Sequence, residues 1–164
     1  MMKADRDKFF KVGMEMGSLE GASRVLDLRQ RTEHNTVALA EHLPLGGQLV
    51  VLGTDPDLND VKKKYHKASP HGAKVQIRLG RTTHVMHEMM DRGEQFNVML
   101  LDAGNAECTT HLRIAFESGL LDTHGTIVLE NAFQGGADYQ PYDHPHATWL
   151  LGEYIANEPT LHKV

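Results

Sequence analysis

Polar residues with the chemistry to bind a ligand follow five apolar runs of the chain. They occupy positions 27–33, 53–55, 80–82, 102–105 and 130–131. Three of them are arginines, and guanidinium groups that converge hold phosphates and carboxylates well. Arg29, Arg31 and Arg81 therefore define a candidate site for a small anion. The alternative is that Arg29 pairs with Glu33 across the turn and fills the space itself, and we favour this second interpretation.

Histidine and cysteine side chains offer two further candidate sites. His84 and His87 stand beside Glu88 and could bind zinc, but the spacing differs from the H-E-x-x-H pattern, so a surface helix is expected. Cys108 begins a predicted helix, where the pKa of a thiol falls. No residue is placed to act as its base, so we expect an incidental or buried thiol.

The elements that must position these residues alternate along the chain. Apolar runs predict strands at 24–28, 48–53, 74–80, 96–102 and 125–131. Helical patterns lie between them, at 36–43, 55–69, 83–93 and 107–121. This alternation predicts an α/β fold with a Rossmann-like, doubly wound sheet, mainly parallel and of about five strands. Ligands bind such sheets at the carboxyl ends of the strands, where the five polar groups fall.

The composition is that of one intracellular domain. The 164 residues suit a single domain, with an N-terminal helix at 1–23, an α/β core at 24–136 and a tail loop and helix at 137–164. The net charge of -5 gives no reason to expect nucleic acid or an anionic membrane as partner. A single cysteine indicates a reducing compartment, and we see no signal peptide or transmembrane segment. A cytoplasmic location is expected.

Three stretches carry a resemblance to a known family. They are "LVVLGTDPD", "FNVMLLDAGNAE" and "GLLDTHGTIVLENAFQGG". From residue 24 onward the chain resembles the class I S-adenosylmethionine-dependent methyltransferases, and most closely the metal-dependent O-methyltransferases of the catechol and caffeoyl-CoA type. The resemblance implies a divalent metal held by Asp102, Glu130 and Asn131, whose oxygen ligands suit Mg²⁺ or Ca²⁺.

The chain departs from this family at the positions that bind the cofactor and take the proton. Asp27 keeps the acid of the first strand, but Arg29 and Glu33 replace the two glycines of the turn. Gly53 stands where the family has an acid for the ribose hydroxyls, and Arg81 replaces the acid after the third strand. Asn105 replaces the general-base lysine, and an amide cannot take a proton from a phenol near neutral pH. These changes predict loss of S-adenosylmethionine binding and no catalytic residue.

The termini are shorter than the resemblance implies. The resemblance implies a longer segment before the first strand and an antiparallel hairpin at the end, and we expect neither in this sequence. The strand at 125–131 would then be a sheet edge open to pairing with another chain.

The leading hypothesis is a catalytically inactive, methyltransferase-like protein without a cofactor. It would act by protein association or homo-oligomerisation, through the edge at 125–131 and the tail helix. The first alternative is an active O-methyltransferase that uses S-adenosylmethionine and Mg²⁺ or Ca²⁺ on a small catechol-like hydroxyl. The second is a small-anion binding module.

Overall fold

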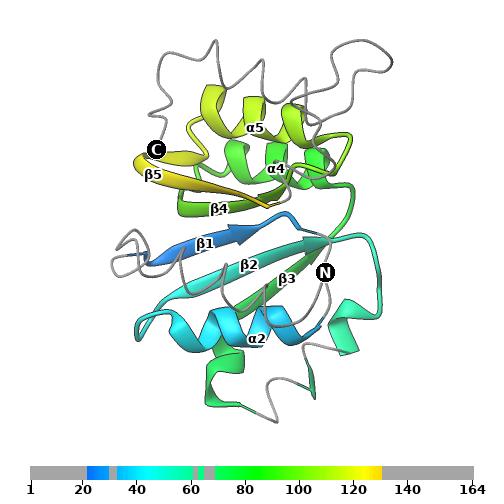
Figure 1. The fold of residues 1–164 in the computed structure, drawn as a ribbon, viewed down its shortest axis with the longest axis vertical. Helices are drawn as coiled ribbons and strands as arrows, with labels where there is room; N and C mark the ends of the chain where they lie inside the picture. The colour runs from blue at the N-terminus through cyan, green and yellow to red at the C-terminus, as the bar shows by residue number, and fades with distance from the viewer. Residues whose placement is uncertain (1–21, 30–32, 61–62, 65–68, 131–164) are drawn as a thin grey trace, which may run out of the picture.

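A computed structural model gives the fold and describes residues 22–29, 33–60, 63–64 and 69–130, without the side chains of 33–35, 37 and 38. In that part of the chain, five parallel strands form one sheet in the order β3-β2-β1-β4-β5 (Figure 1). The strands are β1 (Arg24–Asp27), β2 (Gln48–Gly53), β3 (Val75–Leu79), β4 (Phe96–Asp102) and β5 (Leu121–Glu130). The predicted Rossmann-like sheet is confirmed.

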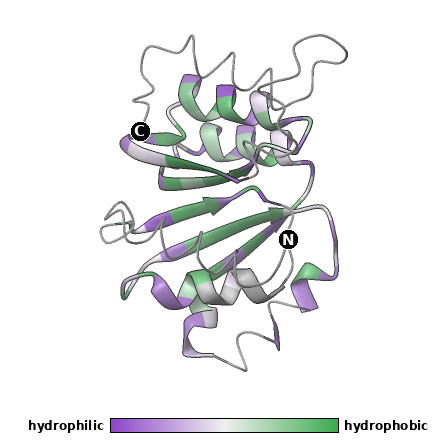
Figure 2. Ribbon diagram, viewed as in Figure 1, coloured by the Kyte–Doolittle hydropathy of each residue, from purple (hydrophilic) through white to green (hydrophobic). Residues whose placement is uncertain are grey.

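Helices cover both faces of the sheet. Helix α2 (Glu33–His42) lies on one face, and α4 (Thr82–Asp91) and α5 (Cys108–Glu117) lie on the other (Figure 1). A short 3-10 helix, η1 (Pro70–Lys74), leads into β3. The strands are apolar along most of their length (Figure 2), because a parallel sheet buried on both faces has few positions open to water. Among the described residues, none of the helices is long and apolar enough to cross a membrane.

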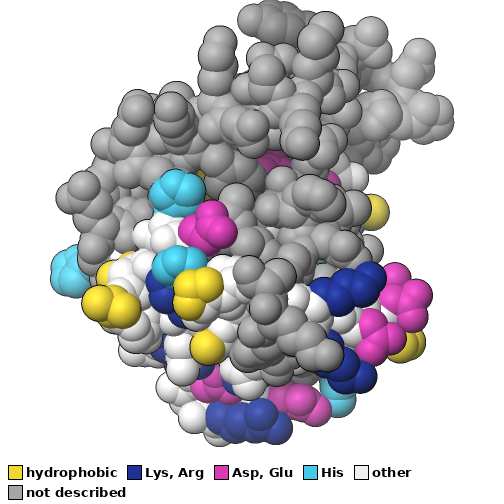
Figure 3. All heavy atoms as spheres, turned by 90° about the horizontal axis from the view of Figure 1, so that it is seen from below, with side chains coloured by type: hydrophobic (Ala, Val, Ile, Leu, Met, Phe, Trp, Pro, Cys, Tyr) yellow, Lys and Arg dark blue, Asp and Glu magenta, His cyan; other side chains and the backbone are white. Residues whose placement is uncertain are grey.

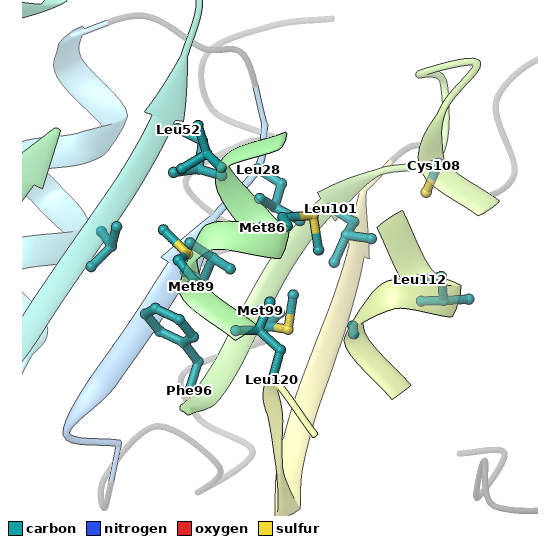
Figure 4. Close-up of a cluster of buried hydrophobic side chains, with 14 of the residues drawn as sticks. Leu28, Leu52, Met86, Met89, Phe96, Met99, Leu101, Cys108, Leu112 and Leu120 are labelled. Atoms are coloured by element: carbon teal, nitrogen blue, oxygen red, sulfur yellow. The ribbon is translucent and has the colours of Figure 1, made fainter. Parts of the chain in front are cut away.

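Two apolar clusters form the core, one on each face. The larger lies under α4 and α5, where Met86 and Met89 are fully buried against Phe96 and Met99 (Figure 4). The smaller lies under α2 and includes Leu39. Methionine suits the larger cluster because its unbranched side chain fills irregular gaps between helices and sheet.

Element boundaries differ from the prediction mainly at β5. This strand begins at Leu121, four residues before the predicted start at 125, and its register against β4 shifts between Phe96 and Val98. The polar residues of 122–124 and Gly125 conceal the start, because they are typical of a turn. Helix α4 ends as expected, with Gly93 at φ 67° beyond its last turn.

Several predictions concern residues outside the described part. These are the helix at 1–23 apart from its last two residues, the tail at 137–164, Asn131 and the absence of a C-terminal hairpin. Among the described strands, β5 is at one edge of the sheet.

The carboxyl ends of the strands bring polar side chains to one face of the sheet. Val25, Leu100 and Val128 pack in the cluster under α2. The residue two positions further along each of these strands points to the same face, because strand side chains alternate. These residues are Asp27, Asp102 and Glu130. Asp27 and Asp102 lie where β1 meets β4 and the order of connection reverses, which is where open α/β sheets bind ligands, and Glu130 ends the next strand.

Candidate functional site

Arg29 forms a buried ion-pair network with two carboxylates. Its Nε and Nη2 atoms donate to Oδ1 and Oδ2 of Asp27, each at 2.8 Å. Its Nη1 atom donates to Oε1 of Glu130 at 2.5 Å. Arg29 is 2% exposed, Asp27 3% and Glu130 8%. We call these three residues the Arg29 network, and it ties the end of β1 to the end of β5.

The side chain of Arg29 runs across the carboxyl end of β4. That strand lies between β1 and β5. The backbone N–H of Leu28 donates to the carbonyl of Leu100 at 2.9 Å, so β1 and β4 remain paired up to the residue before Arg29. Two strand spacings come to about 10 Å, and the side chains of Arg29 and Glu130 together close this gap. The guanidinium is therefore directed towards β5 and away from β2 and β3.

The charges of the network keep Arg29 protonated. Burial on its own lowers the pKa of the guanidinium. The charges and hydrogen bonds of Asp27 outweigh this effect, together with those of Glu130, and the pKa of Arg29 is raised above its ordinary value. A buried cation held by both oxygens of one carboxylate and by a second carboxylate is fixed in position and orientation.

The two described residues of the predicted metal site lie side by side. Asp102 and Glu130 are partners in the β4–β5 register, and the N–H of Ala103 donates to the carbonyl of Glu130 at 2.8 Å. Oδ1 of Asp102 accepts a hydrogen bond from the N–H of Gly104 at 2.9 Å. Asn131 lies outside the described residues, among which no group of three His, Cys, Asp or Glu side chains could hold a metal ion. Arg29 therefore places a positive charge against Glu130, one of the residues predicted to hold the metal.

The ends of β2 and β3 form the other half of the candidate site. A Cβ atom at Gly53 would lie 2.1 Å from Cδ1 of Leu58, so Leu58 covers the position where the resemblance expects an acid. Gly80 follows β3 with φ 145°, a conformation that side chains rarely adopt. Because the Arg29 guanidinium points to β5, it does not extend over this half of the sheet end.

The predicted anion site is not formed by the described arginines. Arg29 is held by Asp27 and Glu130, while the exposed Arg81 lies 3.3 Å from a carboxylate oxygen of Glu107. Arg31 lies outside the described residues, and the side chain of Glu33, the partner predicted for Arg29, is not described. Figure 3 shows basic and acidic side chains intermixed on the face seen from below, so the described part of that face has no patch of one sign.

Residues at the start of α5 have structural roles. Oδ1 of Asn105 accepts from the N–H of Glu107 at 2.8 Å, which fixes the turn before the helix. Cys108 is buried, and burial together with the charge of Asp102 raises the pKa of its thiol to about 11, so it is no nucleophile at neutral pH. On the surface of α4, the imidazole of His84 lies 3.3 Å from Glu88.

One buried polar residue and one long-range contact were not predicted from the sequence. His111 is 3% exposed, and among the described residues its Nε2 atom has no hydrogen-bond partner. The bond between Arg29 and Glu130 joins residues 101 positions apart. The one local signal for the network was the Asp27-x-Arg29 spacing.

Comparison with known proteins identifies the relatives of this chain. A family model described as O-methyltransferase matches residues 1–162. The catechol O-methyltransferase of Niastella koreensis is 27% identical over 117 residues, which is 70% of this chain and 52% of that protein. The chain spans about half the length of the curated relatives it matches.

Solved structures share the fold. The O-methyltransferase TomG of Streptomyces achromogenes, in complex with S-adenosylmethionine, has a TM-score of 0.78 at 21% identity. The match covers 96% of this chain and 70% of that one. An O-methyltransferase of Bacillus cereus, in complex with S-adenosylhomocysteine, has a TM-score of 0.74 at 20% identity and covers 97% and 72%.

These findings correct the leading hypothesis from the sequence. The prediction of a cofactor-free protein that acts only by association is wrong, because the matched family and the curated relative are O-methyltransferases. Structural neighbours carry the cofactor or its product, and nothing in the described residues shows that binding is lost. Arg29, which was expected to pair with Glu33 and fill the cofactor turn, forms its described ion pairs with Asp27 and Glu130.

Proposed function

Because the chain belongs to the O-methyltransferase family, we propose that it transfers a methyl group from S-adenosylmethionine to a hydroxyl group of a small catechol-like molecule. The observation that carries this proposal is the family match over residues 1–162. The curated relative named as a catechol O-methyltransferase supports the class of acceptor. The five-stranded parallel sheet, with carboxylates at the ends of β1, β4 and β5, supports a site at the carboxyl ends of these strands.

The donor would bind over the ends of β1, β2 and β3. The direction of the Arg29 side chain supports this, because its guanidinium lies on the opposite side, against Glu130. Gly53 offers no carboxylate to the ribose hydroxyls, and Leu58 covers that position. A hydrogen bond to a charged group contributes about 1.5–3 kcal/mol, so we expect a donor affinity at least about tenfold weaker than an acid at this position would give.

When bound, S-adenosylmethionine supplies an activated methyl group on a sulfonium. The chain must then hold the acceptor hydroxyl and remove its proton. Asn105 cannot take that proton, and its side chain is engaged at the start of α5. Asp102, which is partly exposed where Asp27 and Glu130 are buried, is the carboxylate we propose as proton acceptor, directly or through water.

A methyl-transfer assay tests the proposal. The purified chain is incubated with S-adenosylmethionine and a panel of catechols, with Mg²⁺ or with a chelator, and methylated products are identified by mass spectrometry. We expect transfer to at least one catechol, and a large loss of turnover in Asp102→Asn. Asp122→Asn is the matched control, because Asp122 lies at the opposite end of β5. Absence of transfer across the panel, with no S-adenosylmethionine binding by calorimetry, would refute the proposal.

A further inference from the structure

We propose that Arg29 is the resident cation of this site and takes the place of a divalent metal at Glu130. The folded chain then binds no divalent metal through Glu130. This part of the inference stands on the Arg29 network alone. Its consequence for catalysis, that methyl transfer needs no divalent metal, rests on the proposed function.

The geometry at Glu130 opposes the binding of a metal ion. A divalent cation such as Mg²⁺ or Ca²⁺ binds a carboxylate oxygen at about 2.0–2.6 Å. Nη1 of Arg29 already lies 2.5 Å from Oε1 of Glu130. A metal ion on this carboxylate would stand next to a guanidinium that is fixed in orientation, and the two positive charges would repel one another.

The Arg29 side chain cannot readily move away from Glu130. Its Nε and Nη2 atoms are both held by Asp27, and the side chain is 2% exposed. Releasing Glu130 to a metal would leave the guanidinium buried with one carboxylate fewer, or would require the whole side chain to leave the interior. Both changes oppose metal binding, because a buried charge is costly unless it is paired.

Three carboxylates near Arg29 require a compensating positive charge. Asp27, Asp102 and Glu130 gather at the ends of three adjacent strands, which would strongly attract a cation. The guanidinium meets two of these three carboxylates directly. Within the described residues, no three His, Cys, Asp or Glu side chains are arranged to hold a metal. The guanidinium of Arg29 therefore supplies the positive charge that these carboxylates require.

Metal binding by the intact protein and by an Arg29 variant tests the inference. Wild type and Arg29→Gly are titrated with Mn²⁺ by calorimetry, and their melting temperatures are measured with Mn²⁺, with Mg²⁺ and with chelator. We expect no metal-dependent shift in the melting temperature of the wild type. Arg29→Gly should gain Mn²⁺ affinity by about tenfold or more, the scale on which groups around a metal site alter its affinity. Its melting temperature should rise with Mn²⁺ and also with methylguanidinium, which can fill the vacated space.

Two control variants make the result specific. Arg78→Gly removes a partly buried arginine that pairs with Glu94 away from this site, and it should lose stability without gaining a response to Mn²⁺. Adding Glu130→Gln to Arg29→Gly should abolish the gain. If Arg29→Gly does not fold, the wild-type titration still decides, and Arg29→Lys, which keeps the positive charge, should remain unresponsive to Mn²⁺.

The inference is overturned if the wild type binds Mn²⁺ with a rise in melting temperature that Glu130→Gln abolishes. That outcome would mean that Arg29 leaves Glu130 when the metal arrives. The methyl-transfer rate is measured separately, and the wild type treated with chelator should keep its rate. A chain with no transfer under any condition would refute the proposed function, while the metal titration would still decide the role of Arg29.

Discussion

Replacing Arg29 by methionine should strongly destabilise the protein. Methionine keeps much of the apolar side-chain volume but removes the charge, so Asp27 and Glu130 lose the guanidinium that joins them. These carboxylates are 3% and 8% exposed, and water cannot readily replace the lost bonds. Removing one partner of a buried ion pair costs about 3–5 kcal/mol. For a domain of this size, that corresponds to a fall in melting temperature of roughly 6–20 °C.

Urea and thermal unfolding followed by circular dichroism measure the effect. Arg81→Met is the matched control, because Arg81 is exposed and its pair with Glu107 should contribute less than about 1 kcal/mol. Adding Asp27→Asn and Glu130→Gln to Arg29→Met should restore much of the stability, since neutral groups of similar shape avoid the buried unpaired charges. If Arg29→Met lowers the free energy of unfolding by less than about 1 kcal/mol, the buried network contributes no more than an exposed ion pair, and the prediction is refuted.

Two substitutions and one labelling reaction test buried or partly buried groups away from the Arg29 network. Hydrogen bonds from Arg78, and to a lesser extent Arg24, lower the pKa of Glu94 below 4.5, so Glu94→Gln should cost about 1–2 kcal/mol at neutral pH. Because ionised Glu94 loses its advantage as it is protonated, the difference between variant and wild type should shrink as acid unfolding is measured below pH 4.5. Burial lowers the pKa of His111 below 6.5, so the unfolded chain binds a proton that the native chain does not, and stability falls as the pH drops through 6.5. His111→Leu should flatten this part of the stability curve measured by urea titration, and an unchanged slope would contradict it. Cys108, with a thiol pKa of about 11, should react with a thiol reagent at pH 8 only as fast as the protein unfolds, and rapid stoichiometric labelling of the native state would argue against its burial.

Most of the fold could be predicted from the sequence, because the signals are local. Uninterrupted apolar runs identify β2 and β4 with their observed limits, and Gly93 marks the end of α4. The start of β5 could not be found, because the polar residues before 125 suit a turn as well as a strand at a register shift. Local patterns report the period of burial along one segment, and they carry no information on how neighbouring strands adjust to one another.

The residues of the site could be predicted from the sequence, but the ion pairs between them could not. The sequence placed Asp27, Arg29, Asp102 and Glu130 at the ends of strands. The structure brings all four together at the carboxyl ends of β1, β4 and β5. The sequence could not show that Arg29 reaches Glu130, because this depends on β4 lying between β1 and β5 and on the direction of one long side chain. The described ion pairs of Arg29 therefore join the ends of β1 and β5.

The loss of stability and the gain of metal binding on removal of Arg29 have one electrostatic cause. Three carboxylates at adjacent strand ends repel one another unless a cation lies among them, and Arg29 is held by two of the three. A variant without the guanidinium should therefore be less stable and, for the same reason, bind an added cation more tightly. Linkage requires that the bound cation restores stability in proportion to its affinity for the folded state. An Arg29→Gly protein that loses stability but responds to neither Mn²⁺ nor methylguanidinium would mean that Arg29 contributes by packing, and that its charge is not what the site requires.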